Sequence, residues 1–354
     1  MKIALCFVIS YEHILNKEEI WKQWIEPNKD IINVYFYYKD REKIKSPWIL
    51  KHALPPQYIH ETSYYHVIPA YLSLMQFALT HDVTNQWLCF LTDSCCPIIS
   101  PQRFRALFYK YWNNTIMSWK PAWWNVTLHK RANLALLPQE LRLANDPWFV
   151  IKRENAMQIL HFSRTKQDVV KTICDGGLAN ESLFAIILNG YKQLIPSETI
   201  SPFTYLTMWS FPMREYKINK QKMTPVISGV THLADWSRMA SATSPHIFKD
   251  ANETDIEFLE ENLKKNKCAM FVRKVAPEFP DEVLEYYIYQ HNREKDEQLA
   301  VNEPFVFMFK RWLIRLWCGL YYCTPLFFNY QYKYDYKNNC QEEPLIENQK
   351  ENTL

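Results

Sequence analysis

Residues 2–10 read KIALCFVIS, an apolar run that turns polar at Tyr11 and Glu12. The run is too short for a signal peptide or a membrane anchor. An apolar run without polar alternation is typical of a strand that is buried on both faces of a sheet. We therefore expect residues 2–9 to form the first buried strand of the fold.

Similar apolar runs alternate with helical patterns along the chain. INVYFYYKDR (32–41) and WLCFLTD (87–93) look like buried strands that end in polar residues. Apolar residues recur at helical spacing over 67–80. Further helices are expected at 17–25, at 101–112, at 254–264 and from about Asn180, its expected N-cap. Strands that alternate with helices predict an α/β fold with a mainly parallel central sheet flanked by helices.

Composition excludes several classes of protein. Net charge is only +3 over 354 residues, so nucleic acid is not expected as a partner. Only five Gly are present and no GxGxxG or Walker sequence occurs, which excludes Gly-rich phosphate cradles. The nine Cys include no CxxC pair, so we expect no zinc site, reduced thiols and a cytoplasmic location.

Charged residues stand at the ends of the predicted strands. The run 268–277, CAMFVRKVAP, ends abruptly in Arg273 and Lys274. Two adjacent cations are poor core material, but they are well placed to meet an anion at the edge of an α/β sheet. Asp40 follows the second strand, where a carboxylate can accept hydrogen bonds from ribose hydroxyls or a base N–H.

The C-terminal part differs in character from the rest. We divide the chain into a domain at 1–280, a helical aromatic extension at 281–340 and a polar, disordered tail at 341–354. As a helix, part of the segment 305–330 would place Phe and Trp on one face and Lys and Arg on another. Such a helix can lie in a membrane interface or dock on the core. Both interpretations remain open.

Six short motifs, in order, carry a resemblance to a known family. They are NVYFYYKDRE (33–42), FLTDSCCPI (90–98), DPWFVIKRENAMQIL (146–160), ANESLFAIIL (179–188), VTHLADWSR (230–238) and FVRKVAP (271–277). This series resembles the Core-2/I-branching β-1,6-N-acetylglucosaminyltransferase family, which includes peptide O-xylosyltransferases and plant relatives. The resemblance covers roughly residues 1–280 in patches, without a long identical stretch.

The resemblance implies a GT-A-like fold and an inverting, metal-independent glycosyltransferase. Its donor would be a UDP-sugar, UDP-GlcNAc first and UDP-xylose as the rival, and no further cofactor is implied. Its acceptor would be a hydroxyl of a glycan, glycoprotein or glycolipid. Inverting transfer needs a carboxylate that takes the acceptor proton, and positive charge on the departing diphosphate.

Matching the motifs assigns roles to individual residues. Glu181 would be the general base. Lys274 would bind the donor diphosphate, helped by Arg273. Asp40 would contact the uridine end of the donor, and Trp236 would stack on the acceptor sugar.

The family pattern is not complete in this chain. A second diphosphate-binding arginine of the family falls near Ser228, which is not basic. Arg238 or Lys222 would have to replace it. Two other interpretations therefore stay open. The chain could be a family member that binds a nucleotide or glycan without catalysis, or a membrane-associated structural protein.

Overall fold

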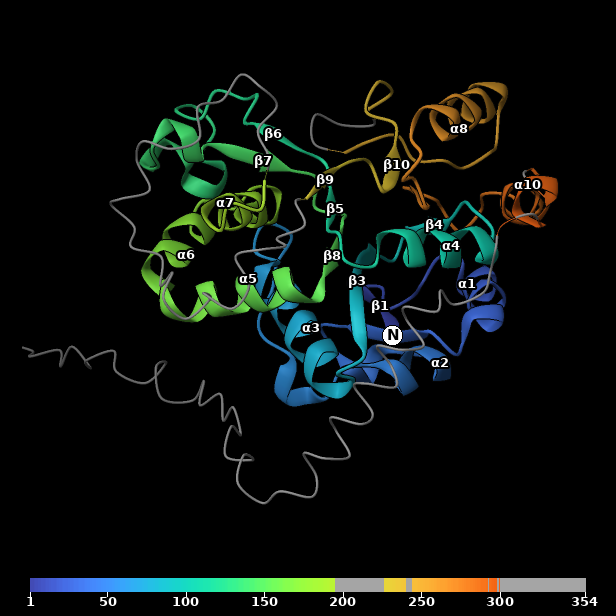
Figure 1. Cartoon of the computed structure of the whole chain (residues 1–354), viewed down its shortest axis with the longest axis horizontal. Coiled ribbons are helices and arrows are strands. Elements are labelled where there is room, and N and C mark those ends of the chain that lie inside the picture. Colours follow the sequence, from blue (N-terminus) through green and yellow to red (C-terminus); the bar gives the residue numbers. More distant parts are fainter. Residues whose placement is uncertain (195–225, 240–243, 292, 298, 300–354) are drawn as a thin grey trace, which may run out of the picture. The chain divides into compact units, whose positions relative to one another are not determined.

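The computed structural model describes residues 1–194, 226–239, 244–291, 293–297 and 299 of the chain (Figure 1). Met1–Asn302 forms one compact unit. The predicted membrane-contacting segment 305–330, the predicted tail 341–354 and Lys222 lie outside the described residues. Among the described residues, no helix is long and apolar enough to cross a membrane.

Strands and helices alternate over most of the described chain, as the sequence predicts. The strands are β1 (Lys2–Val8), β2 (Ile32–Tyr37), β3 (Asn85–Thr92), β4 (Cys96–Pro97), β5 (Ile116–Met117), β6 (Trp119–Pro121), β7 (Leu143–Asn145), β8 (Val150–Lys152), β9 (Ile227–Ser228), β10 (His232–Ala234) and β11 (Phe271–Arg273). The α-helices are α1 (Glu18–Ile25), α2 (Pro47–His52), α3 (Ile68–His81), α4 (Pro101–Tyr111), α5 (Arg153–Thr165), α6 (Gln167–Cys174), α7 (Leu183–Gly190), α8 (Glu253–Lys265), α9 (Asp281–Glu285) and α10 (Arg293–Glu297).

Within the described residues, the largest sheet has six strands in the order β2-β1-β3-β8-β5-β9. β1 pairs in parallel with β2 on one side and with β3 on the other. β8 runs antiparallel to both β3 and β5, and β9 is parallel to β5. The protein is thus an α/β protein with a mostly parallel central sheet flanked by helices, which confirms the predicted class.

The central strands are apolar throughout because both faces of the sheet are covered. Ala4 and Cys6 of β1 belong to a core cluster with buried residues of α3, α5 and α7. On the opposite face, Phe7 meets Trp21 of α1 edge to face, with ring centroids 5.0 Å apart. Trp21 in turn lies 5.7 Å from the ring of Phe271 in β11. Period-2 alternation thus sends neighbouring β1 side chains into two separate cores.

A second, three-stranded sheet of the described chain has the order β10-β11-β4. β10 and β11 are parallel, with Ala234 opposite Arg273, and β4 is antiparallel to β11. β4 follows β3 after a short turn. The amide N of Val275 also donates to the carbonyl O of Ser94 at 2.9 Å. The end of β11 is therefore held next to the end of β3.

The predicted start of a helix near Asn180 is wrong. Leu178 has a left-handed backbone, with φ of 49°. Ala179–Glu181 forms a 3-10 turn, and α7 begins only at Leu183. β10 and β11 are three residues long each, shorter than the apolar runs in which they lie.

Gly176 and Gly177 shape the turn that precedes this 3-10 turn. Gly177 has φ of +63°, in the left-handed region that favours glycine. A Cβ on Gly176 would lie 2.1 Å from the amide N of Asn133 and 2.6 Å from the carbonyl C of Ala132. The 130–133 backbone therefore packs directly against this glycine.

We expect Gly176→Ala to lower the free energy of unfolding by about 3 kcal/mol, because the added methyl group overlaps backbone atoms. Gly229→Ala is the matched control. A Cβ there first meets a side-chain atom, Cγ2 of Ile116, at 3.3 Å, and we expect a loss below about 1 kcal/mol. Urea unfolding measures both losses. Equal losses would contradict the close approach at Gly176.

Candidate functional site

The carboxyl ends of β1, β2 and β3 form one edge of the sheet, and polar residues gather there. After β1, the amide N of Ser10 donates to Oδ2 of Asp93 at 2.9 Å. Further along the same loop, Nε2 of His13 accepts from the amide N of Asp40 at 2.9 Å. The loop after β1 therefore ties Asp40 and Asp93 to the same edge, where α/β sheets bind ligands.

The side chain of Asp40 is 40% exposed at this edge. Its Oδ1 accepts from the amide N of Glu42 at 3.1 Å, and its Oδ2 is 3.3 Å from Nζ of Lys43. Lys43 lowers the pKa of Asp40, helped by the amide of Glu42. The carboxylate is thus ionised at neutral pH and retains lone pairs for a hydroxyl or N–H donor.

Lys274 is half-buried next to the end of β3. Its Nζ donates to Oγ of Ser244 at 2.6 Å. Burial lowers its pKa, as does the positive charge of Arg273, whereas Asp93 acts in the opposite direction. Asp93 therefore acts against the effect of burial on the pKa of both Lys274 and Arg273.

Arg273 is the most unusual charge of the described chain. Its side chain is buried, with 6% of the residue exposed. The guanidinium carbon lies 3.5 Å from the ring centroid of Trp148, a cation–π contact. Its Nε has no hydrogen-bond partner, and no carboxylate of the described residues forms an ion pair with it. Within the described residues, an aromatic face rather than a carboxylate therefore offsets the lost hydration of this cation.

Glu181 is placed by the 3-10 turn rather than by a helix N-terminus. Its Oε2 lies 3.2 Å from Nη1 of Arg131, and 23% of its side chain is exposed. Burial raises the pKa of Glu181 and Asp146 adds to the rise, whereas Arg131 lowers it. A carboxylate whose pKa is raised toward neutrality is a better proton acceptor than an ordinary surface glutamate.

The segment 145–148 contacts both the backbone next to Glu181 and the side chain of Arg273. Asn145 donates from Nδ2 to the carbonyl O of Asn180 at 2.9 Å, one residue before Glu181. Three residues further along the segment, Trp148 lies under the Arg273 guanidinium.

The hydroxyl of Tyr71 also contacts the segment 145–148. It donates to the carbonyl O of Pro147 at 2.9 Å. Burial raises the pKa of Tyr71, Arg273 lowers it and Glu181 raises it further. The electrostatics of this hydroxyl therefore depend on both Arg273 and Glu181.

Trp236 is the outer member of an aromatic stack. Its ring is partly exposed and lies nearly parallel to that of Trp148, with centroids 6.4 Å apart and an interplanar angle of 23°. Trp148 therefore has Trp236 as one neighbour and Arg273 as another. A partly exposed indole next to a buried cation can serve as a stacking surface for a sugar ring.

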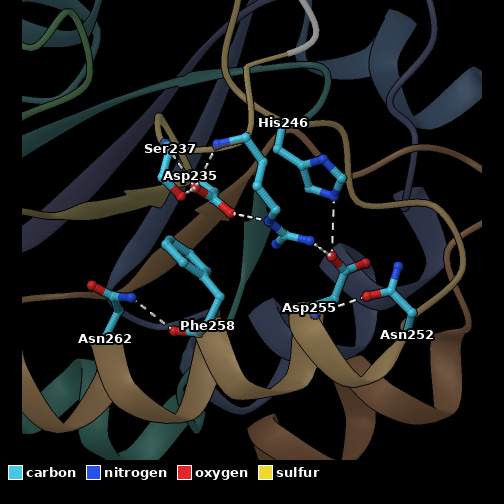
Figure 2. A network of polar contacts seen from close by, with 8 residues as sticks. Asp235, Ser237, His246, Asn252, Asp255, Phe258 and Asn262 are labelled. Carbon is cyan, nitrogen blue, oxygen red and sulfur yellow. Dashed lines mark hydrogen bonds and ion pairs between the residues drawn. The ribbon is translucent and has the colours of Figure 1, made fainter.

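Arg238 is held by two carboxylates. Its Nε donates to Oδ2 of Asp235 at 2.5 Å and its Nη1 to Oδ1 of Asp255 at 2.8 Å. Figure 2 shows Asp255 at the start of α8, with His246 directed toward it, and Nε2 of His246 is 3.0 Å from Oδ1 of Asp255. This pairing favours a structural role that ties 235–238 to α8. Diphosphate binding by Arg238 stays a prediction.

The structure thus places Trp236, Trp148 and Arg273 in one cluster, with Lys274 next to Arg273 and the end of β3. Glu181 is linked to this cluster through the backbone of 145–148. Asp40 shares the sheet edge with Asp93. Sequence reasoning missed Asp93, Tyr71 and Arg131. Asp93 could have been found, because it ends the apolar run 87–93, but Tyr71 looked only like a core position of a helix.

The part of the chain that the structure describes contains no group of three or more His, Cys, Asp or Glu side chains that could hold a metal ion. No protein-family model matches this chain, and a search of curated proteins also finds no match. The resemblance to a glycosyltransferase family therefore remains one of short motifs.

The contact of Glu181 with Arg131 gives a direct test of the local electrostatics. We expect Arg131→Met to raise the pKa of Glu181 further, since the variant removes the one neighbouring charge that lowers it. Carboxyl NMR titration, with Glu181→Gln to assign the resonance, measures the shift. Lys130→Met removes the adjacent exposed cation and should leave this pKa nearly unchanged. A fall in the pKa of Glu181 on removing Arg131 would contradict the described contact.

Proposed function

We propose that this protein is an inverting glycosyltransferase that moves a sugar from a UDP-sugar to a hydroxyl of a glycan, glycoprotein or glycolipid. GlcNAc is the first candidate for the sugar, and xylose is the rival. The observation that supports the proposal most is the buried Arg273 guanidinium, which has no carboxylate partner in the described chain and lies beside Lys274. A GT-A-like arrangement of the sheet belongs to the same proposal.

The cations act on the donor in this proposal. As the bond between the anomeric carbon and the diphosphate oxygen breaks, negative charge grows on the departing UDP. Arg273 and Lys274 would stabilise that charge, and the low dielectric around Arg273 strengthens the effect. Asp40, at the same sheet edge, would accept hydrogen bonds from the uridine end.

Glu181 acts on the acceptor. Its carboxylate would take the proton of the acceptor hydroxyl while that oxygen attacks the anomeric carbon from the face opposite to the diphosphate. The products are the glycosylated acceptor, UDP and protonated Glu181, which then releases its proton to water. Trp236 would stack on the acceptor sugar. The cytoplasm is the proposed compartment, because the cysteines assigned among the described residues are free thiols and most are buried.

A second candidate function is nucleotide or glycan binding without catalysis. The pairing of Arg238 with Asp235 and Asp255 favours it, because this pairing leaves fewer cations for the diphosphate. Both functions predict that UDP binds. They differ in whether sugar is transferred or the UDP-sugar is hydrolysed.

We expect Glu181→Gln to lower turnover of the UDP-sugar by about 100-fold or more, since the amide cannot accept the proton. UDP binding, measured by the thermal shift that UDP produces, should be retained in this variant. Release of UDP from UDP-GlcNAc and from UDP-xylose measures turnover. The control is Glu253→Gln, which changes an exposed carboxylate of α8.

Full turnover in Glu181→Gln would remove Glu181 as the base. UDP binding without turnover of either donor in the wild type would favour the binding function. The same assay with EDTA tests the proposed metal independence. We expect no loss, and a loss that manganese restores would contradict it.

A further inference from the structure

The segment 120–136, called the loop 120–136 below, runs from β6 through the 3-10 turn Arg131–Leu136 and carries an unusual set of exposed side chains. Leu128 is 76% exposed and Trp123 is 60% exposed. The loop contains three cations, Lys120, Lys130 and Arg131, and no Asp or Glu. Single exposed apolar residues are ordinary on protein surfaces. It is less ordinary that one short loop combines an exposed indole, an exposed leucine and several cations.

The base of this loop is firmly attached to the protein. The amide N of Ala122 donates to the carbonyl O of Arg142 at 2.8 Å, and that of Ala132 donates to the carbonyl O of Gly177 at 2.9 Å. Arg131 lies over the ring of Trp124, 5.4 Å from its centroid. These contacts hold both ends of the loop against the body of the protein.

The tip of the loop has a defined shape that presents the apolar residues outward. Oδ1 of Asn125 accepts from the amide N of Thr127 at 3.0 Å and from that of Leu128 at 3.2 Å. Nζ of Lys120 lies 4.1 Å from the ring centroid of Trp123. Leu128 and Trp123 thus stand exposed on a tight, internally bonded turn, with a cation on the indole.

We infer that the loop 120–136 docks the protein on an anionic membrane surface. Indole rings prefer the interfacial region of a bilayer, where the ring meets acyl chains and headgroups. Leu128 can enter the boundary between headgroups and acyl chains, whereas it offers a sugar neither a flat ring nor a hydrogen bond. Exposed lysines of a loop without carboxylates are attracted to anionic lipid headgroups.

The position of the loop gives this docking a consequence for the reaction. Arg131, within the same loop, pairs with Glu181. A membrane bound at the loop would therefore lie on the side of the molecule that holds the candidate base. This favours an acceptor that is attached to a membrane. The consequence rests on the proposed function, but the docking itself does not.

Co-sedimentation of the full chain with lipid vesicles tests the docking without any assay of activity. The vesicles contain phosphatidylcholine with about one third phosphatidylserine, or phosphatidylcholine alone. We expect the wild type to bind the anionic vesicles. The double variant Trp123→Ala/Leu128→Asn should lose at least about tenfold in affinity. Val83→Asn, a change at a 61% exposed valine between α3 and β3, is the matched control and should bind like the wild type.

Two further variants keep the test decisive. Leu128→Asn alone changes a side chain at the tip, so it should fold normally and still weaken binding. Lys120→Glu/Lys130→Glu should weaken binding to anionic vesicles more than to neutral ones. Absence of wild-type binding would overturn the inference. Unchanged binding of the double variant would also overturn it. That result would point to another segment, such as 305–330, as the membrane contact, or to a protein or glycan as the true partner of the loop.

Discussion

Burial of the Arg273 guanidinium sets the electrostatics of the candidate site. A guanidinium removed from water needs a counter-charge or aromatic faces to offset its lost hydration. In the described chain the aromatic contact is with Trp148, whereas Asp93 is a neighbour that does not form an ion pair. β11 places Arg273 by pairing with β10 on one side and β4 on the other. β10 and β4 therefore fix the position of a cation that has no carboxylate partner among the described residues.

The segment 145–148 contacts both Arg273 and the turn that holds Glu181. It joins β7 to β8, so its backbone is fixed at both ends. One end holds the turn of Glu181 through Asn145, and the other presents Trp148 to Arg273. Four consecutive residues thus contact both the turn that holds a carboxylate with a raised pKa and a buried cation. The Gly176–Gly177 turn packs against the backbone of 130–133, next to Arg131, which pairs with Glu181.

Much of the fold can be predicted from the sequence. A strand that is buried on both faces of a sheet is apolar at nearly every position, and runs such as 2–9 and 87–93 fit few other structures. The placement of Arg273 and Lys274 at a strand end follows in the same way. The environment of Glu181 does not. Its partner Arg131 is 50 residues away in the sequence, and the Gly-Gly turn replaces the predicted helix start by a 3-10 turn. Whether Arg238 is available to a ligand depends on Asp255, which periodicity places on α8 without showing its partner.

Calorimetric titration with UDP measures whether Arg273 and Lys274 bind an anion. We expect the wild type to bind UDP. Lys274→Ala and Arg273→Met should each weaken binding about tenfold or more, because each removes a charge-assisted contact to a phosphate. Lys265→Ala, which removes an exposed lysine of α8, should bind as the wild type does. Equal affinity of UDP for the wild type and for both site variants would contradict the account.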